Sequence, residues 1–378
     1  MPRSRILYLN HTATVSGAEN SLLQLLAGLD RERFEPLVVL PESGRFERRL
    51  EDAGIATHIV SLAVPNKLDP WGSWRNLRRL RRIVRDERVA LIHANSFHAV
   101  KYVAPLHALT RLPTVASVRD IVPFTRLTRR IVLSCDRVAC VSHATARNLL
   151  GRDSDPAGGR VRVVYNGVDP GAPVGEVERE ALRAELGLAG APGPLVGMVA
   201  PLVPWKGQPV FLDAARRATA TTGAGSYVLA GDATFSGPDY VETLRRLASV
   251  PELEGRVHMV GFREDVPALL SLLDVVVCAS VEPDPLPRAV LEAMAAARPV
   301  VGSRIGGIPE AIVHGETGLL VEPGRPDELA DGLVALFGDE PLRRELGRAG
   351  ARRVAERFTA ARHCRAVEAL YDELLGGA

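Results

Sequence analysis

The stretch SVEPDPLPRAVLEAMAAARPV, residues 280–300, indicates how this chain folds. It follows a short apolar run, Asp274–Cys278, and it ends in another, Pro299–Gly302. The residues between the two runs have the composition of a helix, and Pro285 and Pro287 fit its first turn, where a missing N–H costs little. A strand, a helix and a second strand in this order predict a parallel βαβ unit.

The same alternation extends in both directions along the 378 residues. Helices are predicted in the first half at 18–29, 44–53, 73–87, 96–109 and 143–151. Further strands are predicted at Arg5–Leu9, Pro36–Leu40, Ala90–His93, Thr114–Val118, Arg137–Val141, Val161–Tyr165, Leu195–Ala200, Tyr227–Ala230, Val257–Val260 and Gly318–Val321. Alternating units of this kind predict doubly wound parallel sheets with helices on both faces.

Turn-rich stretches divide the alternation into two series. DPGAPVG at 169–175 and APGP at 191–194 lie between them. We expect an N-terminal lobe at 1–172, a C-terminal lobe at 173–357 and a terminal segment at 358–378. Apolar residues at helical spacing between Thr359 and Leu375 predict a helix, which we expect to pack back on the first lobe. Ligands bind beyond the carboxyl ends of the strands in such sheets, so we expect one cleft shared by the two lobes.

Composition limits the class of protein. Apolar residues make up 46% and charged residues 24%, which suffices for a core in each lobe and excludes wholesale disorder. The four cysteines form no CxxC pair, so a reduced, cytoplasmic protein is expected. The short apolar run near the N-terminus predicts a first strand rather than a signal peptide. No apolar run reaches the ~18 residues that a transmembrane helix needs.

The charge is unevenly distributed, although the net charge is only +2. Residues 1–172 hold 26 Lys and Arg against 16 Asp and Glu, and residues 173–378 hold 21 against 29. A basic first half favours contact with anions or with a lipid surface. Mutual attraction of the two lobes is the alternative.

Two groups of residues in the second lobe have the chemistry to bind a phosphorylated sugar. Lys206 is one of three lysines in a chain with 44 arginines, and it stands beside Gly207 before a predicted helix, as expected for a phosphate contact rather than a surface lysine. Asp284 and Glu292 are eight residues apart, about two helical turns. Carboxylates accept hydrogen bonds from sugar hydroxyls. The alternative is that Asp284 caps the helix and Glu292 is an ordinary helical residue.

Together these stretches resemble the motifs of glycosyltransferase family 4, whose members have the GT-B fold. The resemblance covers nearly the whole chain and rests on the Asp284–Glu292 helix and on further motifs in matching order, namely SGAE at 16–19, VYNGVD at 164–169, WKG at 205–207, GD at 231–232, VGFREDV at 260–266, GGIPEA at 306–311 and GETGL at 315–319. It implies an α/β protein of two Rossmann-like, doubly wound lobes that face a central cleft.

The resemblance also implies an activity. The protein would be a retaining glycosyltransferase that moves a sugar from a UDP- or GDP-linked donor to an acceptor hydroxyl of a secondary metabolite, a glycolipid or an envelope glycan, with no metal and no prosthetic group. Glu292 would hold the ribose, Lys206 the pyrophosphate and Asp284 the donor sugar, and the base would lie against Phe262 and Arg263. The remaining donor-binding residues would be Gly17, Gly231, Asp232, Leu286 and Arg288.

In the first lobe the resemblance places the acceptor. His11, Asn95 and Asp120 are the expected acceptor-side residues, and Arg119 and His93 join Lys206 and Asp284 as expected catalytic residues. Arg119 stands where many members carry a histidine; it cannot act as a base, but it could hold a phosphate or an anionic acceptor. His93 ends a strand, so a contact in the cleft and a buried structural role both remain open.

The second lobe departs from the family pattern at several positions. Pro201 stands where an arginine is usual, and a lost charge-assisted contact costs roughly 1.5–3 kcal/mol unless another group replaces it. Arg288 is the expected replacement. Pro287 replaces a glycine and removes an amide donor. Asp284 is shorter than the usual glutamate, and Glu282 is its rival for the same role.

Other functions remain open or are disfavoured. A sugar-nucleotide epimerase of the same fold and a non-catalytic nucleotide-sugar-binding protein are the alternatives. The D-x-D pattern at 153–155 is read as a solvated turn. Trp74–Arg88 carries seven arginines, with Trp74, Leu77, Leu80 and Val84 on one stripe, so this helix either faces the core or touches the inner face of a membrane. Few aromatic residues and no recognition motif argue against nucleic acid, and the oligomeric state is left open.

Overall fold

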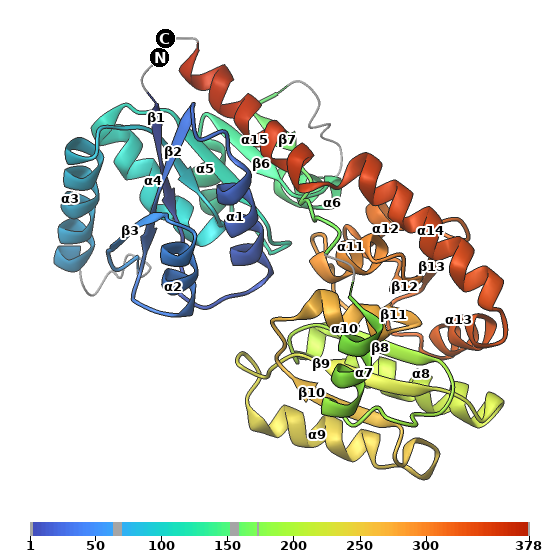
Figure 1. The fold of residues 1–378 in the computed structure, drawn as a ribbon. Helices are drawn as coiled ribbons and strands as arrows, with labels where there is room; N and C mark the ends of the chain where they lie inside the picture. The colour runs from blue at the N-terminus through green and yellow to red at the C-terminus, as the bar shows by residue number, and fades with distance from the viewer. Residues whose placement is uncertain (1–2, 63–69, 152–158, 172–173, 377–378) are drawn as a thin grey trace. The chain divides into compact units, whose positions relative to one another are not determined.

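The chain forms two α/β units. The computed structural model describes residues 3–62, 70–151, 159–171 and 174–376 (Figure 1). One unit comprises residues 1–167 and 360–378, and the other comprises residues 168–359. Within the described ranges, no helix is both long enough and apolar enough to cross a bilayer.

The N-terminal unit contains a seven-stranded parallel sheet in the order β3-β2-β1-β4-β5-β6-β7. The chain runs from β1 to one edge, returns to β4 beside β1, and continues to the other edge, which is the doubly wound topology expected from the sequence. The strands are β1 (Ser4–Leu9), β2 (Phe34–Leu40), β3 (Ala56–Ile59), β4 (Val89–Ala94), β5 (Thr114–Val118), β6 (Arg137–Cys140) and β7 (Val161–Val163).

Helices cover both faces of this sheet. Alternate residues of β1 point to opposite faces: Ile6 and Tyr8 pack with α1 (Gly17–Gly28), α2 (Arg45–Asp52) and α15 (Ala360–Leu375). Leu7 and Leu9 belong to the core on the other face. The helices over that core are α3 (Pro70–Asp86), α4 (Phe97–Thr110), α5 (Arg126–Leu133) and α6 (His143–Leu150).

The C-terminal unit contains a six-stranded parallel sheet in the order β10-β9-β8-β11-β12-β13. Its strands are β8 (Leu195–Val199), β9 (Ser226–Ala230), β10 (Val257–Gly261), β11 (Val275–Cys278), β12 (Val300–Ser303) and β13 (Leu319–Val321). Its helices are α7 (Glu176–Glu185), the short 3-10 turns η1 (Pro204–Lys206) and η2 (Pro251–Leu253), α8 (Gln208–Thr222), α9 (Pro238–Ala248), α10 (Val266–Leu272), α11 (Arg288–Ala295), α12 (Ile308–Ala311), α13 (Pro326–Gly338) and α14 (Glu340–Arg357).

The expected class of fold, two Rossmann-like units with parallel sheets, is confirmed. The helix expected around Asp284 begins later than predicted. Helix α11 starts at Arg288 after Pro287, so Asp284 lies in the preceding loop and does not cap the helix. The reason is that Pro285 and Pro287 disfavour the helical conformation in the residues before them.

Because all strands of a sheet are parallel, the loops after them share one edge. In the N-terminal unit these loops carry His11, Asn95 and Arg119. In the C-terminal unit they carry Lys206 and Asp284. The topology therefore places the candidate residues of each unit along the carboxyl edge of its own sheet.

Candidate functional site

Lys206 and Asp284 form a nearly buried ion pair at the carboxyl ends of β8 and β11. The Nζ atom of Lys206 lies 2.6 Å from Oδ2 of Asp284, and the side chains are 12% and 4% exposed. The hydroxyl of Ser280 donates to the same carboxylate oxygen at 3.1 Å. The Lys206 ammonium also lies 4.2 Å from the centre of the Trp205 ring. The site therefore holds one compact cation, almost shielded from solvent, at the carboxyl edge of the sheet.

Glycines allow the backbone around this pair to pack closely. Gly207 has φ +80°, and a Cβ atom there would lie 2.0 Å from the carbonyl oxygen of Ala279. Gly306 has φ +61°, and a Cβ atom there would lie 2.1 Å from the carbonyl oxygen of Asp284. The N–H of Gly307 donates to that same oxygen at 2.7 Å. The loop after β12 thus holds the backbone of Asp284 in place.

Arg288 and Glu292 form a second pair on α11. Nη2 and Nε of Arg288 lie 2.9 and 3.2 Å from Oε1 of Glu292, and both side chains are partly exposed. The residue expected to hold ribose and the residue expected to replace the missing arginine are therefore bound to each other. Glu282, the rival of Asp284, is exposed.

The turn after β9 packs on the loop that contains Pro201. Gly231 has φ +154°, and a Cβ atom there would lie 1.9 Å from the carbonyl oxygen of Ala200. The carbonyl of Asp232 accepts from the N–H of Leu202 at 2.7 Å. Gln208, fully buried, donates to the carbonyl of Pro201 at 2.8 Å. No sequence motif indicated the role of Gln208.

The expected base-binding segment follows β10. Phe262 is 41% exposed. Arg263 donates to Oδ1 of Asp265 at 2.7 Å and to Oε1 of Glu185 at 2.6 Å, and its guanidinium lowers the pKa of Asp265. Arg263 therefore fixes the segment to α7, and Leu286, the remaining expected donor contact on the loop before α11, is buried.

Asn95, one of the expected acceptor-side residues, belongs to a hydrogen-bonded polar cluster at the carboxyl edge of the first sheet. Asn95 donates to Asn10 at 2.8 Å, and Asn10 donates to the buried carboxylate of Glu19 at 3.2 Å. Glu19 also accepts from the N–H of Ser16, which caps α1, so Gly17 occupies the first position of that helix. The SGAE motif thus fixes the loop after β1 to the end of β4.

His11 belongs to the same edge. Its Nδ1 atom is 2.9 Å from the hydroxyl of Ser96, and its ring stacks on His98 with centroids 4.9 Å apart. Burial and the charge of His11 lower the pKa of His98, which sequence reasoning did not single out.

Arg119 and Asp120 follow β5. Arg119 is buried and donates to Oδ1 of Asn166 at 2.6 Å. The link joins the loop after β5 to the VYNGVD motif. Asp120 is partly exposed, and its charge acts on His98 in the direction that raises the pKa.

His93 is buried, and both ring nitrogens have partners. Nδ1 lies 2.6 Å from the hydroxyl of Tyr371, and Nε2 lies 2.8 Å from the hydroxyl of Ser117. The Tyr371 hydroxyl in turn lies 2.7 Å from that of Tyr8. This chain of hydrogen bonds joins α15 to the sheet, and it favours the structural interpretation of His93 over a contact with substrate.

The stability of the protein should depend on pH through this histidine. Burial lowers the pKa of His93 to about 3, against about 6.5 in an unfolded chain. Only the unfolded chain takes up this proton between those values, so the free energy of unfolding decreases as the pH falls from about 6.5 to 3. We expect a loss of about 2 kcal/mol between pH 7 and pH 5, measured by urea unfolding. The variant His93→Gln should show a shallower dependence; an equally steep one would contradict this assignment.

Within the described ranges, no group of three or more His, Cys, Asp or Glu side chains could hold a metal ion. The D-x-D pattern at 153–155 lies outside the described residues.

Comparisons with known proteins agree with the fold of two Rossmann-like units. Residues 15–172 match the family model described as Glycosyltransferase Family 4, and residues 193–339 match the model described as Glycosyl transferases group 1. The structure is similar to that of HepE from Anabaena, crystallised with UDP and glucose, with a TM-score of 0.87 and 27% identity, covering 98% of this chain and 100% of that one.

Two curated relatives extend the comparison. The alpha-D-kanosaminyltransferase of Streptomyces kanamyceticus is 28% identical over 342 residues, which is 80% of this chain and 85% of that protein. The N-acetyl-alpha-D-glucosaminyl L-malate synthase of Bacillus anthracis is 35% identical over 148 residues. That match spans 39% of this chain and 37% of the relative.

Proposed function

The chain belongs to glycosyltransferase family 4, and from this premise we propose that it transfers a sugar from a nucleoside-diphosphate sugar to an acceptor hydroxyl. The observation that carries the proposal is the nearly buried Lys206–Asp284 pair at the carboxyl edge of the second sheet. An ammonium with so little solvent around it stabilises charge on a leaving diphosphate far more than an exposed one would.

The donor is bound by the C-terminal unit. Lys206 leaves Asp284 for the pyrophosphate, and the carboxylate of Asp284 then accepts from hydroxyls of the donor sugar. Glu292 accepts from the ribose hydroxyls. UDP is the first nucleotide to test, because HepE from Anabaena was crystallised with it.

Transfer proceeds with retention of configuration and without a metal ion. The acceptor oxygen bonds to the anomeric carbon on the side from which the diphosphate departs, as the bond between that carbon and the phosphate oxygen breaks. The hydroxyl proton passes to the departing phosphate oxygen. No protein base is needed, so Arg119 in place of a histidine is compatible with this reaction. The protein contributes orientation and stabilisation of the leaving group.

The acceptor is a hydroxylated molecule bound along the carboxyl edge of the N-terminal sheet, where His11, Asn95 and Asp120 lie. Arg119 favours an anionic acceptor. A cytoplasmic location agrees with Cys135, Cys140, Cys278 and Cys364, which are all free thiols and buried.

Incubation with labelled nucleotide sugars tests the proposed reaction. Transfer of label to an acceptor, with the anomeric configuration kept in the product, is the expected result. Release of an epimerised nucleotide sugar would identify an epimerase. Saturable binding with no turnover on any acceptor would identify a binding protein.

Arg288 supplies the positive charge that Pro201 lacks. We expect Arg288→Ala to weaken donor binding about tenfold to a hundredfold, because a charge-assisted hydrogen bond contributes roughly 1.5–3 kcal/mol. Calorimetric titration with the nucleotide measures the effect. Arg304→Ala is the matched control, since Arg304 also pairs with a glutamate, Glu322, in the same unit. Full donor affinity in Arg288→Ala would eliminate this role.

A further inference from the structure

Helix α3 exposes two tryptophans at its start. Trp71 is 73% exposed and Trp74 is 46% exposed, and their rings meet edge to face with centroids 6.2 Å apart. The guanidinium of Arg78 lies 3.7 Å from the Trp74 ring centre. The sequence placed Trp74, Leu80 and Val84 on one stripe of the helix. In the structure, Leu80 and Val84 lie in the core, whereas Trp74 is exposed to solvent beside Trp71.

Further exposed apolar side chains lie on the same side of the sheet. In the described part of this unit, the large apolar side chains with the greatest exposure also include Leu109 on α4 and Leu127 on α5, the latter 68% exposed. Helices α1, α2 and α15, which cover the other face of the sheet, contribute none of these side chains.

The two faces differ sharply in charge. Helices α3, α4, α5 and α6 together carry eleven Arg and Lys residues against a single acidic residue, Asp86. Helices α1, α2 and α15 carry five against seven. The basic excess found in the first half of the sequence is thus concentrated on one side of the sheet. We call the exposed surface of α3, α4 and α5 the basic face.

Topology places the tryptophans near the acceptor side. Helix α3 follows β3 and leads into β4, and α5 follows β5 and leads into β6. A helix that connects two parallel strands runs back antiparallel to them, so its first residues lie at the carboxyl edge of the sheet. Trp71, Trp74 and Leu127 are all in the first turns of their helices. They border the same edge as His11 and Asn95.

We propose that the basic face docks on an anionic lipid bilayer, with Trp71, Trp74 and Leu127 entering the interface and the surrounding arginines contacting lipid phosphates. Tryptophan prefers the boundary between headgroups and acyl chains, and Arg and Lys side chains are attracted to anionic lipids. The docking places the acceptor side beside the membrane surface; this consequence for the acceptor rests on the proposed function.

A bilayer fits this surface better than other anionic partners. An anionic polymer such as nucleic acid would be held by the arginines, but it would give no reason for apolar side chains with up to 73% exposure at the helix ends. A bilayer interface can contact both groups of side chains, because the arginines bind lipid phosphates while the exposed apolar side chains enter the boundary of the acyl chains.

Sedimentation of the full chain with lipid vesicles tests the proposal. Vesicles of equal parts phosphatidylglycerol and phosphatidylcholine should bind the chain, and vesicles of phosphatidylcholine alone should bind it at least tenfold more weakly. Binding should weaken strongly at 1 M salt, where the Debye length is about 3 Å.

Two variants separate the contributions. Arg75→Gln/Arg78→Gln/Arg82→Gln should reduce partitioning by on the order of a hundredfold, from about 1 kcal/mol for each basic residue near the surface. Trp71→Ser/Trp74→Ser should reduce it at least tenfold while the charge is unchanged.

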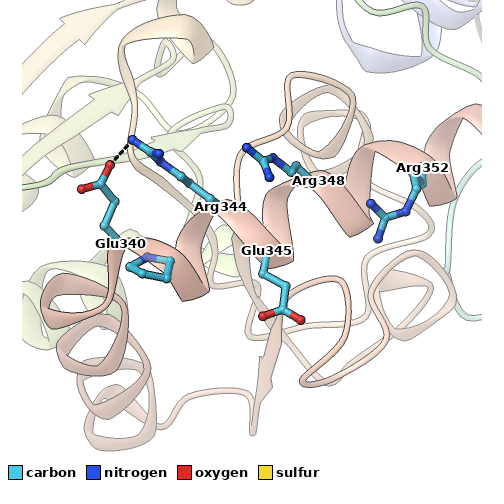
Figure 2. A pocket seen from close by; sticks show the side chains of 6 residues that line it. Glu340, Arg344, Glu345, Arg348 and Arg352 are labelled. Atoms are coloured by element: carbon cyan, nitrogen blue, oxygen red, sulfur yellow. Dashed lines mark hydrogen bonds and ion pairs between the residues drawn. The ribbon is translucent and has the colours of Figure 1, made fainter.

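Helix α14 offers a matched control. Figure 2 shows Arg344, Arg348 and Arg352 in a row along this helix, with Arg344 paired to Glu340. These arginines are exposed like those of α3, but the pocket they line contains Glu340 and Glu345 and no aromatic residue. Arg344→Gln/Arg348→Gln/Arg352→Gln removes the same charge and should leave vesicle binding nearly unchanged.

The outcomes distinguish this proposal from the proposed function. A chain that binds UDP but fails to bind anionic vesicles overturns the membrane proposal and leaves the transferase intact. A chain that binds anionic vesicles but no nucleotide overturns the proposed transferase function and leaves the membrane proposal intact. Equal losses in the α14 and α3 arginine variants, or binding to an RNA but not to vesicles, would also overturn docking on a bilayer.

Discussion

Replacing Lys206 by alanine should lower kcat/KM for sugar transfer by about a hundredfold to a thousandfold, the usual cost of removing one group that stabilises a developing anion. The same change leaves the carboxylate of Asp284, a side chain that is 4% exposed, without its partner. Breaking a buried pair in this way costs about 3–5 kcal/mol. We therefore expect loss of activity and of stability together, measured by steady-state kinetics and by urea unfolding.

A double variant separates the two effects. Lys206→Ala/Asp284→Asn contains no unpaired buried charge, so it should recover much of the stability but none of the activity. Lys101→Ala removes another of the three lysines, on α4, and should keep normal donor affinity. If Lys206→Ala turned over as fast as the unaltered protein, Lys206 would have no role in the reaction.

The second large effect is expected at Gly306. Alanine there adds a Cβ atom 2.1 Å from the carbonyl oxygen of Asp284 and 2.6 Å from its amide nitrogen, so the loop before α11 must move. Donor affinity should fall at least tenfold, since the carboxylate of Asp284 moves with its backbone. Calorimetric titration with UDP measures this loss.

Gly315 supplies the matched control for that substitution. It has φ +76°, close to the +61° of Gly306, but a Cβ atom there would have no neighbour within 4 Å. Gly315→Ala should cost only the left-handed backbone strain, about 1–2 kcal/mol, with donor affinity unchanged. Equal donor affinities in the two variants would show that packing on Asp284 is irrelevant to the site.

The sequence predicted the parallel strands well because buried strands of α/β proteins are continuous apolar runs. In the first half of the chain, where helices were predicted by residue range, it missed two elements for identifiable reasons. Strand β3, ATHI, lies at the edge of its sheet and is only half-buried, so no apolar run marks it. Helix α5, RLTRRIVL, has two turns with one fully buried residue, Val132, so its helical periodicity is weak.

The sequence singled out the candidate residues of the second unit one at a time and did not predict which of them pair. The eight-residue spacing singled out Asp284 and Glu292. In the structure, each carboxylate pairs with a positively charged side chain, and the two partners lie at different distances along the sequence. Arg288 is a neighbour on the same helix, whereas Lys206 is 78 residues away in sequence. The pairing of Lys206 with Asp284 depends on β8 lying beside β11 in the sheet. Local sequence does not reveal this strand order.

The roles of two residues that fix the backbone were also missed, although one of them, Glu19, lies in the SGAE motif. Gln208 and Glu19 contact neighbouring loops through side chains that are almost completely buried. In the sequence, nothing marks either side chain as one that is buried against a neighbouring loop. In the structure, each of these buried polar groups forms a hydrogen bond with the adjoining loop, and this bond offsets the cost of its burial. The position of that loop cannot be read from the sequence.

Calorimetric titration of the full chain with UDP, repeated on Lys206→Ala and Glu292→Gln, tests most directly whether the two residues hold one nucleotide. One site per chain is predicted, with affinity reduced at least tenfold by each substitution. Unchanged affinity in both variants, or no binding of UDP, GDP or ADP to the unaltered chain, would contradict the assignment.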